Sequence, residues 1–106
     1  MPMEPLALIY APATKKHLLE IDKEHHSLIR DAIAGQLTFE PEVESRNRKP
    51  LKRPAVPESE WEIRFGRQNR FRVFYRVRQN PRQIEILGIG EKKGKDLIIG
   101  GQKIES

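Results

Sequence analysis

The segment 61–77, WEIRFGRQNRFRVFYRV, alternates large apolar side chains with charged ones on both sides of a short polar turn. Successive side chains of a β-strand point to opposite faces of a sheet, so this alternation predicts a hairpin with one apolar face and one basic face. The apolar face is expected to hold Trp61, Ile63, Phe65, Phe71, Val73, Tyr75 and Val77.

The same alternation predicts the register of the hairpin. A slip of one residue would place Arg64 opposite Phe71 and would mix the two faces. The predicted pairs are therefore Trp61–Tyr75, Glu62–Phe74, Ile63–Val73, Arg64–Arg72 and Phe65–Phe71.

The polar face of this hairpin carries the first candidate binding residues. Arg64 and Arg72 would lie about 5 Å apart, an arrangement that suits bidentate binding of a phosphate. Glu62 lies diagonal to Arg72, so a purely structural Glu–Arg ladder is the alternative. Phe74 is expected to be exposed beside Arg76 and to stack on an unpaired base, unless the preceding loop or the chain's tail covers it. Arg67 and Arg70 near the turn are expected to be solvated.

The remaining segments predict an α+β fold. A strand is expected at 5–12, and a helix at 13–35 that ends at Gly35. Asp22 is a possible cap for a second helix, so the helical region is a possible hairpin with a break near 21–24. A loop with no strand is expected at 36–60. Further strands are expected at 60–65, 70–78 and 83–90, with one more short strand possible at 96–101. Helices would then cover one face of a mainly antiparallel sheet.

Positive charge is concentrated in the second part of the chain. The net charge is +5, and residues 46–106 carry 16 Lys or Arg against 7 Asp or Glu. This asymmetry favours a polyanionic partner such as nucleic acid, although a solvated basic surface has equal weight on charge alone. The RNA-binding residues expected in the loop are Arg46, Arg48, Lys49, Lys52 and Arg53.

A second basic cluster follows the last long strand, in GEKKGK at 90–95. Lys92, Lys93 and Lys95 emerge at the end of this strand. Together with Arg64 and Arg72 they would form a convergent basic pocket, and the alternative is a solvated lysine-rich turn.

Composition limits where the protein acts and what it binds. The chain has no cysteine, which excludes disulfides and thiolate metal sites and fits a reducing cytoplasm. No stretch approaches the roughly 20 apolar residues of a membrane span, and the run at 6–10 is too short for a signal peptide. His17, His25 and His26 lie on the predicted helix, where the two adjacent rings cannot share a face. We expect no metal, no cofactor and no membrane partner.

Four stretches resemble, in order, the RelE/ParE family of toxins from bacterial type II toxin–antitoxin modules: ALIYAPATKKHLLEI, SRNRKPL, WEIRFGRQNRFRVFYRV and IEILGIGEKKGKDLIIGG. The resemblance implies one domain over 1–106, with an N-terminal strand, a helical hairpin and a curved antiparallel sheet. RelE-like members cleave mRNA on the ribosome without a metal, whereas ParE-like members inhibit DNA gyrase. An antitoxin neutralises either kind.

The resemblance can be applied position by position. It implies that Arg72 holds the scissile phosphate and that Arg64 matches a basic position on the preceding strand. Glu62 stands where RelE has a lysine proposed as general base, and Lys92 or Lys93 falls near a further basic residue. RelE-like members also use a tyrosine in the C-terminal segment. This chain departs from that pattern, because its two tyrosines lie in predicted strands.

Three functions remain open at this point. The first is a ribosome-dependent mRNA endoribonuclease that inhibits translation. In it Arg64 and Arg72 hold the phosphate, Glu62 is the candidate base, and Lys92 or Lys93 is either the acid or a charge stabiliser. The second is a non-enzymatic inhibitor of gyrase, and the third is a degenerate toxin that binds only its antitoxin. In each case the expected partner is an antitoxin with an acidic segment that covers the basic sheet face.

Overall fold

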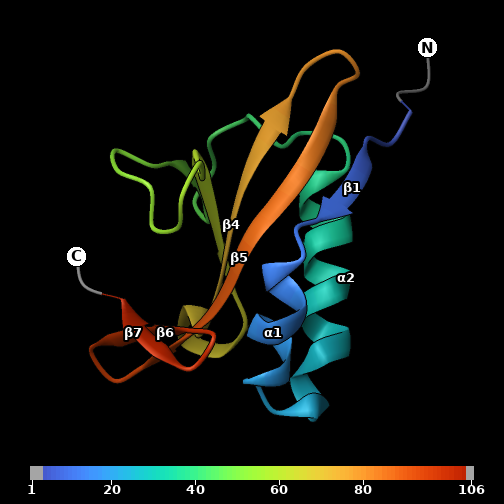
Figure 1. Ribbon diagram of the computed structural model, residues 1–106. Helices are drawn as coiled ribbons and strands as arrows, with labels where there is room; N and C mark the ends of the chain where they lie inside the picture. Colours follow the sequence, from blue (N-terminus) through green and yellow to red (C-terminus); the bar gives the residue numbers. More distant parts are fainter. Residues whose placement is uncertain (1–3, 105–106) are drawn as a thin grey trace.

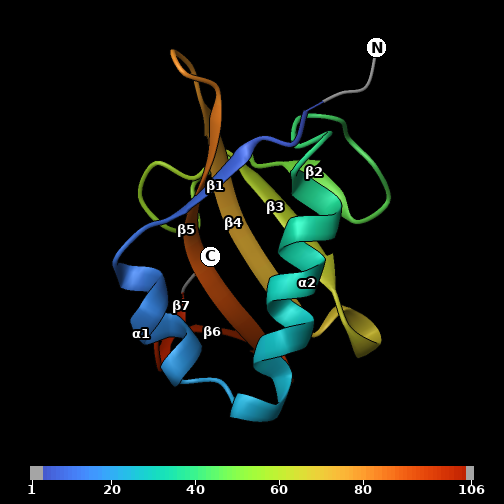
Figure 2. The ribbon, with the colours of Figure 1, turned by 90° about the vertical axis from the view of Figure 1, so that its right-hand side faces the viewer.

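A seven-stranded, mainly antiparallel sheet organises the chain, and both α-helices lie on one of its faces (Figure 1, Figure 2). The computed structural model describes residues 4–104. Strands follow the order β2-β3-β4-β5-β6-β7, and β1 pairs in parallel with β5. The α+β architecture predicted from the sequence is confirmed. The elements are β1 Ala7–Tyr10, α1 Ala13–Leu19, η1 Lys23–His25, α2 His26–Leu37, β2 Arg48–Pro50, β3 Trp61–Phe65, η2 Arg67–Asn69, β4 Phe71–Arg78, β5 Gln83–Lys93, β6 Asp96–Ile99 and β7 Gln102–Ile104.

The hairpin of β3 and β4 has the predicted register at all five pairs, from Trp61–Tyr75 to Phe65–Phe71. Its apolar face packs against the helices and forms the core. Burial of this face favours this register, because a slip of one residue would put arginine side chains into the core. The buried core residues of this hairpin are Ile63, Phe65, Phe71, Val73, Tyr75 and Val77.

Strand β5 contains a bulge opposite the middle of β4. Phe74 pairs with Gly88 and Tyr75 with Ile86, so one extra residue of β5 lies between these two pairs. The inward-facing positions therefore change from Ile84 and Ile86 to Ile89, all of them fully buried. A bulge bends its strand, and Figure 1 shows β5 curving along its length. The apolar residues of this strand therefore face the core both before and after the bulge.

The helical region is broken, at the place where the sequence made a second helix possible. Helix α1 ends at Leu19, a 3-10 turn follows, and α2 begins at His26. The prediction that the helix ends at Gly35 is wrong, because α2 continues to Leu37. Burial of Leu37, in line with Ile29 and Ile33, favours the extra turn.

Within residues 4–104, neither helix combines the length and the apolar character that crossing a membrane requires.

Two short strands were not predicted from the sequence. Strand β2 lies inside the segment 36–60, which was expected to contain no strand, and it pairs with β3. Strand β7 pairs with β6 at the end of the described chain. Both are three residues long, too short for an alternating pattern to be recognised.

Gly66 and Gly35 give opposite predictions for stability. Gly66 has φ 81° and ψ 176°, a conformation nearly restricted to glycine, and an added Cβ would lie 2.8 Å from Cδ2 of Phe71. Gly66→Ala is expected to lower the free energy of unfolding by about 1–3 kcal/mol. Gly35 lies within α2 with nothing within 4 Å of an added Cβ, so Gly35→Ala is expected to raise it by roughly 0.5–1 kcal/mol. Urea unfolding measures both changes, and equal effects would contradict this description.

Candidate functional site

Two arginines and a glutamate meet on the sheet face opposite the helices. Arg64 and Arg72 are direct cross-strand partners. The Arg64 Nε–H donates to Oε1 of Glu62 at 2.8 Å, and Arg72 Nη1 lies 3.6 Å from Oε2 of the same carboxylate. Glu62 therefore lies between the two guanidiniums and reduces the repulsion between them. The ion-pair ladder foreseen as an alternative is present.

Arg72 is the more constrained of the two arginines. Its side chain is 10% exposed, against 44% for Arg64. The Arg72 Nε–H donates to the carbonyl oxygen of Asn69 at 3.1 Å. Burial and then the Arg64 charge lower the pKa of Arg72 from its ordinary value, while Glu62 acts in the opposite direction. A guanidinium has five N–H donors, so Arg72 retains donors for a ligand in a fixed orientation.

A hollow of about 640 Å³ opens beside Arg72, and we call it the Arg72 hollow. Its cations are Arg53, Arg72, Lys92 and Lys95, and no acidic side chain is among the described residues that line it. Its other lining residues are Pro54, Ala55, Leu97 and Ile104. Four positive charges beside an apolar surface suit an anionic ligand that also has an apolar ring, such as a nucleotide.

The fold assembles this hollow from distant parts of the sequence. Arg53 comes from the loop between β2 and β3, Arg72 from β4 and Lys92 from β5. Lys95 lies in the turn after β5, and the short strands β6 and β7 contribute the apolar residues Leu97 and Ile104. Figure 1 shows the loop and the β6–β7 hairpin on the side of the sheet away from the helices.

The position expected for Phe74 is wrong. Its side chain is 1% exposed, and the loop between β2 and β3 covers it. Val56 of that loop and Phe74 both lie next to Gly88, within 3.5 Å of the Cβ position of that glycine. Phe74 therefore packs beneath the loop, on the sheet face opposite the helices. Its buried ring is not exposed for stacking on a base. The loop was foreseen as one possible cover.

The side chains of Arg48 and Arg76 also bind other groups of the protein. Arg48 is buried, and its two Nη groups donate at 2.8 Å to the carbonyl oxygens of Val43 and Gln36. The expectation of a free, ligand-binding Arg48 is wrong for this reason. Arg76 pairs with Glu85 at 2.8 Å and with Glu58 of the covering loop at 3.5 Å, so it ties the loop to the sheet.

The remaining predicted residues divide by position. Arg46 before β2, Lys49 in β2 and Lys52 after it are exposed, and Arg53 reaches the Arg72 hollow. Lys93 is the backbone partner of Asp96 in the β5–β6 ladder, and its side chain points to the opposite face from Lys92. The sequence thus indicated Lys92 and Lys95 beside Arg72, whereas Arg64 is not one of the residues that line the hollow.

Neither tyrosine lies at the Arg72 hollow. Tyr75 is fully buried in the core, where its hydroxyl donates to the carbonyl oxygen of Pro41, and burial raises the pKa of this hydroxyl. Tyr10 lies on the helix side of the sheet and lines a different hollow.

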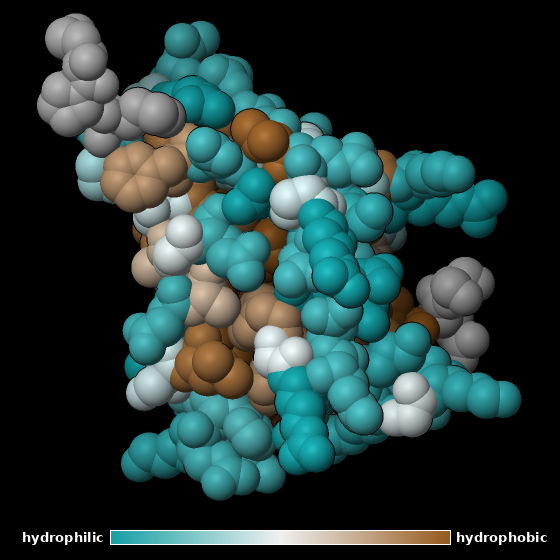
Figure 3. All heavy atoms as spheres, turned by 180° about the vertical axis from the view of Figure 1, so that it is seen from behind, coloured by the Kyte–Doolittle hydropathy of each residue, from teal (hydrophilic) through white to brown (hydrophobic). Residues whose placement is uncertain are grey.

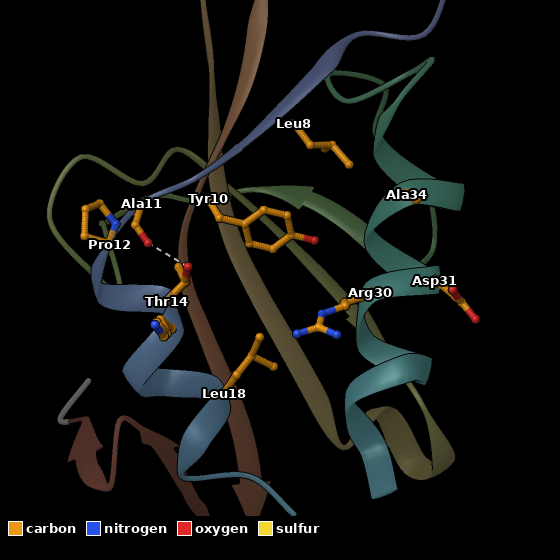
Figure 4. Close-up of a pocket in the computed structure, with 10 residues that line it drawn as sticks. Leu8, Tyr10, Ala11, Pro12, Thr14, Leu18, Arg30, Asp31 and Ala34 are labelled. Atoms are coloured by element: carbon orange, nitrogen blue, oxygen red, sulfur yellow. Dashed lines mark hydrogen bonds between the residues drawn. The ribbon is translucent and has the colours of Figure 1, made fainter. Parts of the chain in front are cut away.

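That different hollow is an apolar groove of about 810 Å³ between α1, α2 and β1. Figure 4 shows Tyr10 and Arg30 pointing into it, with Thr14 bonded to the carbonyl oxygen of Ala11 at its edge. Seen from behind, apolar surface gathers on the half of the molecule that carries the helices (Figure 3). The groove exceeds the Arg72 hollow in volume, but it lacks a concentration of positive charge.

The histidines have structural environments. His17 Nδ1 accepts the N–H of Ile89 at 3.3 Å, and burial followed by the Lys16 charge lowers the pKa of His17. His25 packs at the edge of the core with its ring centroid 5.2 Å from that of Phe71. The ligand atoms of His25, Asp22 and Glu24 lie within 4.8 Å of one another at the turn between the helices. This group shares no residue with the Arg72 hollow.

Comparison with known proteins identifies the class of fold. The sequence matches no protein-family model and no curated protein. The structure, however, is similar to that of a solved protein. It matches a chain of the toxin–antitoxin complex RelBE2 from Mycobacterium tuberculosis with a TM-score of 0.66 and 20% sequence identity, over 86% of this chain and 95% of that one. The RelE-like fold expected from the sequence is therefore confirmed.

Proposed function

We propose that this protein is the toxin of a toxin–antitoxin module and that it cleaves mRNA on the ribosome, thereby inhibiting translation. The observation that carries the proposal is the Arg72 hollow, where four cations converge beside an apolar surface. The similarity to a chain of a toxin–antitoxin complex supports the role of toxin. The exposed residues Arg46, Lys49 and Lys52, in and beside β2, would contact ribosomal RNA by charge.

The chemistry proposed is transesterification by the RNA's own 2′-OH. The 2′ oxygen attacks phosphorus and the bond to the 5′ oxygen breaks, which leaves a 2′,3′-cyclic phosphate and a 5′-OH. Arg72 would hold the phosphate, Glu62 would take the 2′ proton, and a lysine would protonate the leaving oxygen. Position favours Lys92 over Lys93 for this last role, because Lys92 lines the hollow.

Glu62→Gln tests the proposed base. The amide keeps the size of the side chain but cannot take a proton, so cleavage of ribosome-bound mRNA is expected to fall by about 10²–10⁴-fold. Binding of a non-cleavable 2′-O-methyl RNA is expected to persist or tighten, because a negative charge next to Arg72 has been removed. Cleavage at the wild-type rate would instead reduce Glu62 to a structural partner of the two arginines.

A second function, inhibition of DNA gyrase without catalysis, draws on a different observation. The Glu62 carboxylate is held by both Arg64 and Arg72, and neither tyrosine lies at the hollow. A binding surface needs no general base and no tyrosine, so this arrangement suits it as well. A supercoiling assay separates the two functions: inhibition at micromolar protein, without RNA cleavage, would favour gyrase.

Under either function we propose an antitoxin whose acidic segment covers Arg64 and Arg72. Carboxylates placed there would remove the repulsion between the two guanidiniums. Arg64→Glu is expected to weaken antitoxin binding by at least about tenfold. Calorimetric titration measures the change, and Arg78→Glu, on an exposed residue at the far end of β4, is the matched control. Equal affinity of the Arg64 variant and the wild type would contradict this placement.

A further inference from the structure

A second basic hollow adjoins the Arg72 hollow. It has a volume of about 400 Å³ and is lined by Arg67, Gln68, Arg70, Lys92 and Gly94. Lys92 lines both hollows, so the two hollows are neighbours that meet at this lysine. We call the second one the Arg67 hollow.

The backbone holds this hollow in place. Gln68 and Asn69 have φ values of 58° and 53°, which fold the chain tightly between β3 and β4. The turn closes through a hydrogen bond from the N–H of Arg70 to the carbonyl oxygen of Arg67, and the N–H of Lys92 donates to Arg70 O at 2.8 Å. The turn is thereby attached to the end of β5, and its two arginines are brought to the lysine.

Arg70 is oriented by two neighbours and is not freely solvated, which corrects the expectation from the sequence. Its Nε–H donates to the buried carboxylate of Glu91, and its guanidinium carbon lies 5.3 Å from the centre of the Phe71 ring. These contacts fix the plane of the guanidinium and leave further N–H donors for a ligand. The three cations of the hollow outweigh the single Glu91 charge.

We propose that the Arg67 hollow binds the phosphodiester next to the one held at Arg72, so that single-stranded RNA runs from one hollow to the other past Lys92. This inference rests on the proposed function and adds a second backbone subsite to it. Two adjoining cationic hollows that share one lysine fit a ligand with repeated phosphates better than a ligand with one. Single-stranded nucleic acids are bound in this way, by positive grooves that follow the backbone.

The test measures binding of a fluorescent 2′-O-methyl oligouridylate of about eight nucleotides, which cannot be cleaved, over a range of salt concentrations. Arg67 is exposed, so Arg67→Gln preserves the fold. This variant is expected to bind about fivefold more weakly at 0.1 M salt. The negative slope of log K against log salt is expected to become shallower by about 0.7, the value for one lost phosphate contact. Arg78→Gln makes the same change of charge away from both hollows and is expected to leave the slope unchanged.

The outcomes separate the inference from the function on which it rests. If Arg72→Ala weakens binding while Arg67→Gln leaves affinity and slope unchanged, the second subsite is wrong and the proposed function stands. If Arg78→Gln makes the slope shallower by as much as Arg67→Gln does, long-range attraction accounts for the effect and the subsite is wrong. If neither Arg67→Gln nor Arg72→Ala alters binding, both proposals fail.

Discussion

Arg72→Ala is expected to lower the rate of cleavage of ribosome-bound mRNA by about 10²–10³-fold, the usual effect of removing one donor that stabilises transition-state charge. Arg72 is held by Asn69 and Glu62, and it lines the hollow where we place the scissile phosphate. Growth inhibition by the expressed protein is expected to disappear with the activity. Primer extension on a defined mRNA measures the rate.

Two further variants make this result specific. Arg72→Lys keeps the charge but loses the planar pair of donors, so it is expected to recover only part of the activity. Arg78→Ala removes an exposed arginine of the same strand and is expected to cleave at the wild-type rate. A thermal melt establishes that the Arg72 variants remain folded. Full activity in folded Arg72→Ala would contradict the role proposed for this residue.

Phe74→Ala is expected to lower the free energy of unfolding by about 3–5 kcal/mol, because it opens a cavity beneath the loop that covers the sheet. Phe74 is 1% exposed and is covered by Val56 of that loop. Urea unfolding of the purified protein measures the loss. A surface aromatic that stacked on RNA would give almost no change in stability when replaced.

Phe74→Leu is the matched control, since it keeps an apolar side chain in the cavity but removes the aromatic ring. This variant is expected to fold and to bind the 2′-O-methyl oligouridylate as tightly as the wild type. If Phe74→Leu weakened RNA binding as strongly as Arg72→Ala, the ring would be contacting a base and the buried position would be wrong.

The register of the hairpin was predictable because its two faces differ so strongly in polarity. A slip of one residue would move Phe65, Ile63 and Trp61 away from the core side, and the structure has the register that keeps them there. The cross-strand position of Arg64 and Arg72 follows from it. Local patterns of this kind can be read from the sequence without any knowledge of tertiary contacts.

Features that depend on distant segments could not be predicted. Burial of Phe74 requires the loop to fold back over the sheet, and burial of Arg48 requires carbonyl oxygens at Gln36 and Val43. The bulge in β5 changes which residues face the core midway along the strand. Gly35 is a common stop signal, yet packing of Leu37 extends the helix beyond it.

Part of the candidate site could be predicted from the sequence. GEKKGK pointed to lysines at the end of a strand, and Lys92 and Lys95 do lie beside Arg72. The contribution of β7 had no signal in the sequence, because a three-residue strand shows no periodicity. From the sequence, Arg67 and Arg70 belong to a solvated turn. The structure attaches this turn to β5, so that the two arginines line the Arg67 hollow together with Lys92, which also lines the Arg72 hollow.

The most direct test of the proposed function is the identity of the RNA ends made on the ribosome. Purified protein, translating ribosomes and one defined mRNA are incubated together, and the new 5′ and 3′ ends are mapped and chemically typed. We predict new 5′-OH ends paired with 2′,3′-cyclic phosphates for the wild type and none for Arg72→Ala. Absence of new ends with the wild type, or identical ends with Arg72→Ala, would contradict an RNA-cleaving site at Arg72.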